Sequence, residues 1–379
     1  MPTRSRATLI LAVALPLLAA SVLAPPAAAA EQSEEHAFAV VTLVRGLEHP
    51  WGLDFLPDGD LLVTERPGRL RLVRGGDLLL DDPIRGTPEV NDRRQGGLLD
   101  VALHPDFASN QLVYLSYSAD GEGGTGTEVC RGRLVEGQLL DVEVVFVQRP
   151  KTSGSLHYGS RLLFARDGTL HVTLGERYRH MDQAQDPGDH LGTVVRIAPD
   201  GSIPPDNPFA GGDGGAPEVF SYGHRNVQGI DQRPADGAIW IHEHGPKGGD
   251  EVNILERGAN YGWPAITYGV DYSGAIISEK THAPGMEQPV LQWTPSIAPC
   301  GLAFYQGDAF PRWRGDLFVG ALKHTHLRRL VLDGDQVVHQ EELLRDRSRR
   351  IRDVNVGPDG LIYVLTDHAD GELLRLEPR

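Results

Sequence analysis

The sequence of 379 residues has few of the residues that cross-link small secreted domains. It contains two cysteines and three methionines, and aromatic residues make up only 7%. Two cysteines cannot supply the disulfide framework that stabilises domains with a small core, so the fold must depend on a hydrophobic core of its own. Cys130 and Cys300 are either one bridge or two buried thiols, and the sequence does not decide between them.

Long hydrophobic runs are also missing, except at the N-terminus. Residues 9–23 are almost entirely apolar, follow a short basic start and precede the alanines at 27–30. This pattern is typical of a secretory signal peptide, which we predict at residues 1–30. No adjacent pair of arginines precedes the run, which favours the general secretory route over the twin-arginine route. No other segment approaches the ~20 apolar residues of a membrane span, so we expect residues 31–379 to be a periplasmic or secreted domain.

Basic residues are in deficit. The chain has 36 Lys and Arg against 52 Asp and Glu, for a formal net charge of −16. An acidic surface repels nucleic acid and anionic membranes, so we expect neither as a partner. Any anionic ligand must be met by a local cluster of basic side chains.

One sequence unit recurs six times along the chain. It consists of a short apolar strand, a turn built on Asp-Gly or Pro-Asp, and a second apolar strand. The six copies are at residues 52–65, 100–116, 161–174, 229–242, 301–320 and 353–365. Hairpins that cannot bury both faces alone predict an all-β fold, a six-bladed β-propeller with four-stranded antiparallel blades in a single domain. A two-sheet sandwich is the alternative, which the length and the six copies disfavour.

The connections between the repeats are long. The chain exceeds what six minimal repeats of ~40–45 residues need, and the extra residues lie mainly at 119–128, 178–192, 202–218 and 264–289. Loops on a rigid scaffold commonly carry function. A strand at residues 39–44 is expected to complete the last blade and close the ring.

His157 and Glu176 are candidates for an acid–base pair. His157 begins the segment His-Tyr-Gly-Ser-Arg at the inner start of the third repeat, and Glu176 follows the next strand. A carboxylate beside a histidine fixes its tautomer and stabilises its protonated form, as a general base requires. A structural histidine bonded to backbone is the alternative.

Arg225 and Asn226 belong to a second polar run, which continues to Gln228 and precedes the fourth repeat. A guanidinium and an amide together can hold a carbonyl or an oxyanion. The alternative is a surface turn.

A third segment, residues 242–251, has the composition of a metal site. Gly245 and Pro246 forbid the helix that a zinc-binding His-Glu-x-x-His motif needs. Their carbonyls, with the oxygens of Glu243 and of nearby asparagines, suit Ca²⁺, a hard ion that takes six to eight oxygen ligands. A plain glycine-rich turn is the alternative.

Lys323, Arg350 and Arg352 form a fourth, basic group. The two arginines alternate about Ile351, so on a strand both point to one face. They repel one another unless an anion lies between them. A solvated, charged edge strand is the alternative. Together with Gln95, the four segments describe a pocket at the channel mouth that suits a polyanionic, carbonyl-rich organic cofactor.

These motifs resemble the soluble pyrroloquinoline quinone (PQQ) dependent sugar dehydrogenases, most closely their aldose sugar dehydrogenase branch. The matching segments span nearly the whole mature chain in the family's order, at residues 94–97, 157–161, 175–176, 223–226, 243–246, 249–251, 260–264, 322–323 and 350–353. The resemblance implies oxidation of the C1 hydroxyl of aldoses to lactones by hydride transfer to PQQ, with Ca²⁺ as Lewis acid. Electrons would then pass to a small-molecule acceptor or a periplasmic protein.

The resemblance also implies a role for each site residue. His157 takes the proton of the anomeric hydroxyl, Glu176 orients His157, and Arg225 with Asn226 binds the quinone oxygen. The implied cofactor clamp consists of Gln95, Lys323, Arg350 and Arg352. The implied metal ligands are the carbonyls of Gly245 and Pro246, with Glu243 and Tyr261 at this or a second, structural Ca²⁺ site. Trp293 is implied as an aromatic wall over the sugar.

Two departures from the glucose-specialised branch favour broad aldose use. Leu156 stands where that branch has Asp, and Glu176 replaces another Asp. Two other functions stay open: a Ca²⁺-dependent propeller lactonase, which does not need the basic clamp, and a non-enzymatic propeller that binds a glycan or a protein. The sequence also leaves open whether the protein is a monomer or a homodimer.

Overall fold

The computed structural model describes residue 2 and residues 30–379. The predicted signal peptide therefore lies almost entirely outside the described residues. Helix is scarce in the described part. It is confined to α1 (Phe107–Asn110) and the short 3₁₀ turns η1 (Met181–Gln185), η2 (Pro311–Trp313) and η3 (Arg345–Arg347).

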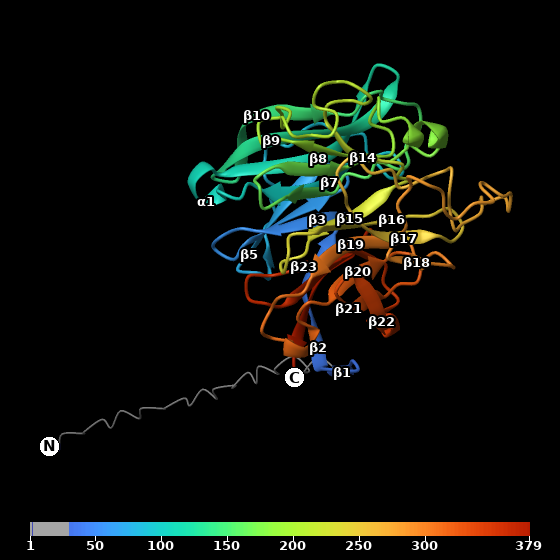
Figure 1. Cartoon of the computed structure of the whole chain (residues 1–379). Helices are drawn as coiled ribbons and strands as arrows, with labels where there is room; N and C mark the ends of the chain where they lie inside the picture. The colour runs from blue at the N-terminus through green and yellow to red at the C-terminus, as the bar shows by residue number, and fades with distance from the viewer. Residues whose placement is uncertain (1, 3–29) are drawn as a thin grey trace.

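Six antiparallel sheets follow one another along the chain (Figure 1). The first three blades, each ordered from its inner strand outward, are β3 (Pro50–Phe55), β4 (Leu61–Glu65), β5 (Arg69–Arg74) and β6 (Leu78–Leu79); β7 (Leu98–Leu103), β8 (Leu112–Gly121), β9 (Gly124–Val135) and β10 (Gln138–Val147); and β11 (Leu162–Phe164), β12 (Leu170–Thr173), β13 (Thr193–Ile197) and β14 (Val219–Tyr222). The last three are β15 (Val227–Gln232), β16 (Ile239–Glu243), β17 (Asp250–Ile254) and β18 (Leu291–Trp293); β19 (Pro299–Phe304), β20 (Leu317–Ala321), β21 (Leu327–Asp333) and β22 (Gln336–Leu343); and β23 (Ile351–Val356), β24 (Ile362–Thr366), β25 (Gly371–Pro378) and β2 (Ala37–Leu47), extended by β1 (Ala30–Gln32). The predicted six-bladed propeller is confirmed.

The N-terminal strand closes the ring. Strand β2 pairs antiparallel with β25, with Val41 opposite Arg375, so the two ends of the domain lie in one sheet (Figure 1). This confirms the expected closure by residues 39–44. Strand β2 thereby covers the edge of β25 that would otherwise be free.

The hydrophobic core consists of the layers between neighbouring blades. Tyr114 and Val129 of the second blade pack on Leu170 and Val172 of the third, and all four are fully buried. Cys130 and Cys300 are also buried, and both are free thiols. The two-thiol alternative is therefore the correct one, and burial in the sheets makes a bridge unnecessary for stability.

The inner strands of neighbouring blades are joined by aspartates. Each carboxylate accepts a hydrogen bond from the backbone of the next inner strand: Asp54 from Leu103 N at 2.7 Å, Asp100 from Leu162 N at 2.9 Å, Asp231 from Phe304 N at 2.7 Å and Asp353 from Leu53 N at 3.2 Å. These bonds satisfy backbone donors that no sheet reaches. They explain why the repeat carries an aspartate on its inner strand.

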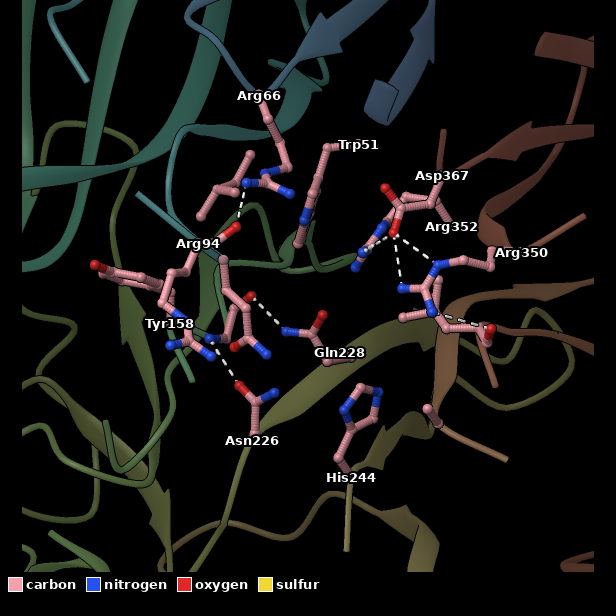
Figure 2. A pocket seen from close by; sticks show the side chains of 15 residues that line it. Trp51, Arg66, Arg94, Tyr158, Asn226, Gln228, His244, Arg350, Arg352 and Asp367 are labelled. Atoms are coloured by element: carbon pink, nitrogen blue, oxygen red, sulfur yellow. Dashed lines mark hydrogen bonds and ion pairs between the residues drawn. The ribbon is translucent and has the colours of Figure 1, made fainter. Parts of the chain in front are cut away.

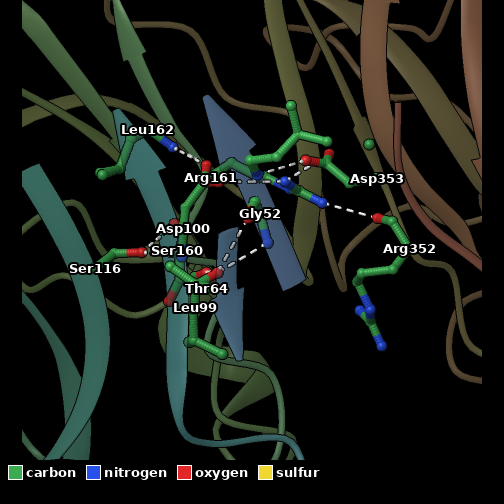
Figure 3. Close-up of polar contacts among 12 residues, drawn as sticks. Gly52, Thr64, Leu99, Asp100, Ser116, Ser160, Arg161, Leu162, Arg352 and Asp353 are labelled. Carbon is green, nitrogen blue, oxygen red and sulfur yellow. Dashed lines mark hydrogen bonds and ion pairs between the residues drawn. The ribbon is translucent and has the colours of Figure 1, made fainter. Parts of the chain in front are cut away.

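Arg161 lies at the centre of the ring. Its guanidinium is 2.8 Å from Asp353 and 3.4 Å from Asp100, and it donates to the carbonyl of Arg352 at 2.9 Å (Figure 3). It also stacks over the ring of Trp51, 4.1 Å from the ring centroid. Burial and the neighbouring carboxylate raise the pKa of Asp353, against the lowering effect of Arg161. This ionic layer separates a cavity at the start of the inner strands from a second one at their ends.

Within the part of the chain that the structure describes, none of the helices has the length and apolarity needed to traverse a lipid bilayer.

Candidate active site

A cavity of about 340 Å³ opens where the inner strands begin, and all six blades contribute to its lining. Figure 2 shows that polar side chains converge on it from separate segments. Its lining includes Trp51, Arg66, Gln95, Tyr158, Asn226, Gln228, Arg350, Arg352 and Asp367. Of the predicted cofactor residues, Gln95, Asn226, Arg350 and Arg352 are therefore brought together.

Arg350 and Arg352 share one internal counter-ion. The Oδ2 atom of Asp367 lies 2.9 Å from Arg350 Nη2 and 2.7 Å from Arg352 Nη2 (Figure 2). Burial opposes ionisation of Asp367, but Arg352 and Arg350 overcome it and hold its pKa far below the usual range. The anion that the sequence requires between the arginines is thus partly supplied by the protein. Sequence reasoning missed Asp367 because it follows a different strand, β24.

Lys323, predicted as part of the same clamp, is not brought to the cavity. Its side chain is exposed, and the neighbouring Leu322 lines the cavity instead. A further cation that lines the cavity is Arg66, directly after β4 in the neighbouring first blade. A single arginine after a strand gives no signal in the sequence.

His157 and Glu176 meet as predicted. His157 Nδ1 is 2.9 Å from Glu176 Oε1, and both side chains are buried. The carboxylate fixes the proton on Nδ1, which leaves Nε2 as the acceptor. Burial, followed by the charge of Arg225, lowers the pKa of His157 despite the opposing effect of Glu176. The imidazole is therefore neutral at pH 7, the state in which a base accepts a proton.

The backbone around this pair is strained. His157 has φ 53°, and Arg177 and Tyr178 have φ 62° and 70°, in the left-handed region that residues with a side chain rarely adopt. Gly175 is required between them, because a Cβ there would collide with the carbonyl of His157. Strain of this kind concentrates at functional sites.

Gln95 links the histidine to the cavity wall. Its Oε1 accepts the backbone N–H of His157 at 2.8 Å. The side-chain amide of Asn226 accepts from Gly159 N at 3.1 Å, which leaves its NH₂ group for a ligand. Both amides are thereby fixed by the backbone of the third blade.

Arg225 lines a second, smaller cavity, and His244 lines both cavities. Arg225 donates to the carbonyls of His244 at 3.1 Å and of Gly245 at 2.8 Å, and its Nε has no hydrogen-bond partner although it is buried. Arg352 Nε is buried without a partner in the same way. Buried donors of this kind carry a large cost unless a ligand satisfies them.

Three of the predicted metal residues, Glu243, Gly245 and Tyr261, line the smaller cavity, of about 10 Å³, whereas Pro246 is not among its lining residues. Glu243 accepts hydrogen bonds from Arg225 N at 2.6 Å and pairs with His224 Nδ1 at 2.9 Å. Glu251 faces the same cavity, and burial together with the charge of Glu243 raises its pKa to about 8. Two carboxylates crowded together without a cation favour protonation of one of them.

Not every predicted metal ligand presents its side chain there. The Tyr261 hydroxyl donates to Ile254 O at 2.6 Å and accepts from Glu256 N, so it is bound away from the carboxylates. Residue 2 and residues 30–379 contain no group of three or more His, Cys, Asp or Glu side chains arranged to hold a metal. Ca²⁺ at this place would depend on backbone carbonyls as much as on side chains.

Trp293, predicted as an aromatic wall over the sugar, lies elsewhere. It is buried between the fourth and fifth blades with Val319 and Leu330, and its Nε1 donates to Gln340 at 2.8 Å. The aromatic residue beside the histidine is Tyr178, 43% exposed, with its ring edge-on to His157 at a centroid distance of 5.3 Å. In the sequence, the only indication of a role for Tyr178 was that it lies two residues after Glu176.

Comparisons with known proteins agree with this geometry. The family model described as glucose/sorbosone dehydrogenase matches residues 47–375. The aldose sugar dehydrogenase YliI of Escherichia coli K12 is 47% identical over 339 residues, which cover 88% of this chain and 91% of the relative. The quinoprotein glucose dehydrogenase B of Acinetobacter calcoaceticus is 27% identical, over 86% of this chain and 85% of the relative.

Two solved structures give the same result. The apo form of the soluble aldose sugar dehydrogenase from E. coli superposes with a TM-score of 0.87 at 45% identity, covering 90% of this chain and all of that one. The PQQ-bound aldose sugar dehydrogenase of Streptomyces coelicolor superposes with a TM-score of 0.74 at 29% identity, covering 94% and 100%. The resemblance inferred from the motifs is confirmed, and the chain belongs to the glucose/sorbosone dehydrogenase family.

Proposed function

We propose that this protein is a PQQ- and Ca²⁺-dependent aldose sugar dehydrogenase that oxidises the C1 hydroxyl of aldoses to the lactone. The observation that carries the proposal is a carboxylate-oriented histidine, His157, whose backbone N–H is held by Gln95, a residue of the cavity that Arg350 and Arg352 also line. We further propose that the protein is exported, because residues 1–30 read as a signal peptide.

The cavity residues fit an anionic, carbonyl-rich cofactor. Arg350 and Arg352 face the cavity, Asn226 has a free NH₂ group, and the buried Nε atoms of Arg225 and Arg352 have no partner. Charge-assisted hydrogen bonds from guanidinium groups suit carboxylates. These residues, with Gln95, would hold PQQ, which when bound supplies the carbon that accepts hydride.

The donor set beside Arg225 fits Ca²⁺. The carbonyls of Gly245 and Pro246 and the carboxylates of Glu243 and Glu251 are all oxygens, which Ca²⁺ prefers over nitrogen or sulfur. A divalent cation near the two carboxylates would also relieve the crowding that raises the pKa of Glu251. Glu251 is thus a proposed Ca²⁺ ligand in addition to the predicted ones.

The chain's own residues account for the proton. His157 Nε2 takes the proton of the C1 hydroxyl, and Glu176, hydrogen bonded to Nδ1, stabilises the imidazolium that results. Removal of this proton raises the electron density on C1 as hydride leaves. Arg225 and Asn226 stabilise negative charge that develops on an oxygen placed between them.

Tyr178 is the proposed sugar contact in place of Trp293. Its exposed ring lies beside the base, where the apolar face of a pyranose can pack on it. An exposed aromatic ring gives contact area at a small cost in side-chain entropy.

The test is dye-linked oxidation of several aldoses by the purified protein, with PQQ and Ca²⁺ added and with EDTA as a control. We expect activity that requires both additions. His157→Ala should lower kcat by about 10²–10⁴-fold, the contribution of a general base, while it retains PQQ binding. The matched control His339→Ala, on the outer strand and half exposed, should leave kcat unchanged. Absence of oxidation with every aldose, or lactone hydrolysis without PQQ, would contradict the proposal.

A further inference from the structure

Arg66 is a cation of the cavity without a counter-ion of its own. Its Nε donates to the carbonyl of Gly96 at 3.0 Å, and its Nη2 donates to the carbonyl of Arg94 (Figure 2). These acceptors are neutral backbone groups. Across residues 30–379, no carboxylate comes close enough to Arg66 to form an ion pair.

The charges around the cavity do not balance. Four arginines, Arg66, Arg94, Arg350 and Arg352, line it together with one acidic residue, Asp367. Burial, followed by the charge of Arg352, lowers the pKa of Arg66, so the positive charges of the two arginines repel each other. A positive cavity in a chain of net charge −16 is costly unless an anion enters it.

The arginines come from two neighbouring blades. Arg66 follows β4 of the first blade, whereas Arg350 and Arg352 flank Ile351 at the start of β23 in the sixth. Asp367 neutralises only the sixth-blade pair. A ligand with a single negative charge can neutralise either Arg66 or the Arg350 and Arg352 pair, whereas a ligand with several negative charges can neutralise both.

We propose that Arg66 is a direct contact for a carboxylate of the cofactor, on the first-blade side of the cavity beside Arg350 and Arg352. The inference rests on the proposed function and adds Arg66 to the cofactor clamp that the sequence predicts. Arg66 also holds the loop that carries Gln95, through the carbonyls of Arg94 and Gly96. The two roles are separable, because only the first depends on ligand charge.

The test compares PQQ with its trimethyl ester, which has the same ring system and no carboxylates. Dissociation constants are measured by absorption or fluorescence titration of the purified protein with Ca²⁺, for the wild type, Arg66→Gln, Arg66→Lys and the control Arg74→Gln. Arg74 is in the same blade, but its side chain is 60% exposed and it pairs with Asp60 at the surface.

We expect Arg66→Gln to weaken PQQ binding at least tenfold and binding of the ester less than threefold. Arg66→Lys should restore part of the loss, and Arg74→Gln should match the wild type. Equal weakening for PQQ and the ester would overturn the proposal, because it would show that Arg66 acts only through the loop. PQQ binding by Arg66→Gln as tight as by the wild type would overturn it as well.

The proposed function can fail separately. If the wild type does not bind PQQ, that function is refuted, and the same variants are then titrated with benzene-1,3,5-tricarboxylate. Weaker binding of this anion by Arg66→Gln than by the wild type supports the role of Arg66 in holding carboxylates. Equal binding, or none by the wild type, overturns it.

Discussion

Asp367 is the residue whose removal tests the electrostatics of the cavity most directly. Asp367→Asn keeps the shape of the side chain and removes its charge. The side chains of Asp367 and Arg352 are 7% and 10% exposed, so the substitution leaves a nearly buried guanidinium without a counter-ion. Breaking a buried pair in this way costs about 3–5 kcal/mol.

Two features reduce that cost. Arg350 is 42% exposed, so its share of the loss is screened by solvent. Arg352 also lines a cavity that water can enter. We therefore expect Asp367→Asn to lower the free energy of unfolding by about 3 kcal/mol, the low end of the range, which for a domain of this size corresponds to a fall in Tm of roughly 4 °C.

The assay is equilibrium unfolding in guanidinium chloride at pH 7, with thermal unfolding as a second measure. Asp370→Asn is the matched control, because this aspartate is 78% exposed and only 3.6 Å from Arg349. It should change stability by less than about 0.5 kcal/mol. Adding Arg352→Met to Asp367→Asn should recover stability, since the uncompensated charge is then gone.

Two results would refute the reasoning. One is a loss in Asp367→Asn no larger than in Asp370→Asn. The other is additivity: a double variant that loses as much free energy of unfolding as Asp367→Asn and Arg352→Met lose together. Substitutions of residues that interact are not expected to be additive.

Three further predictions concern other parts of the molecule. Tyr178→Ala should raise KM for aldoses at least fivefold with kcat little changed, and Tyr178→Phe should not; a kcat loss alone would contradict the platform role. Asp54 and Asp231 have pKa values raised to about 6 by burial, so the folded state binds protons that the unfolded state releases above about pH 4. Their contribution to the free energy of unfolding therefore falls as the pH rises from about 4 to about 6, and Asp231→Asn should make the measured pH dependence less steep in this window; an unchanged slope would contradict it. Cys130 and Cys300 should react with a thiol reagent only after unfolding, and both should react without prior reduction because they are free thiols. Rapid reaction of the native protein would contradict their burial.

The fold could be predicted because its signal is repeated. Each hairpin alternates apolar residues around a turn, and six copies leave few alternatives. The pairing of β2 with β25 was also predictable, since a strand precedes the first full repeat. The aspartates that join the inner strands were visible only as part of the repeat. Their function depends on contacts between blades, which no local pattern contains.

The candidate site was predictable only in part. His157 and Glu176 were found because both lie where strands meet the channel, and strand ends are fixed by the repeat. Lys323 lies in a loop and its side chain is exposed, while Leu322 lines the cavity, so its place in the clamp stays a prediction. Asp367 and Arg66 gave no signal, because each acquires its role from partners in other segments.

The closure of the ring by β2 also has a consequence for how the protein folds. Val41 pairs with Arg375, so the sixth blade requires both ends of the domain. During synthesis, β2 must wait with its edge unpaired until almost the whole chain has been made. Contacts so distant in sequence slow folding and leave edges open to aggregation. Completion of the last blade thus requires both ends of the domain to be synthesised.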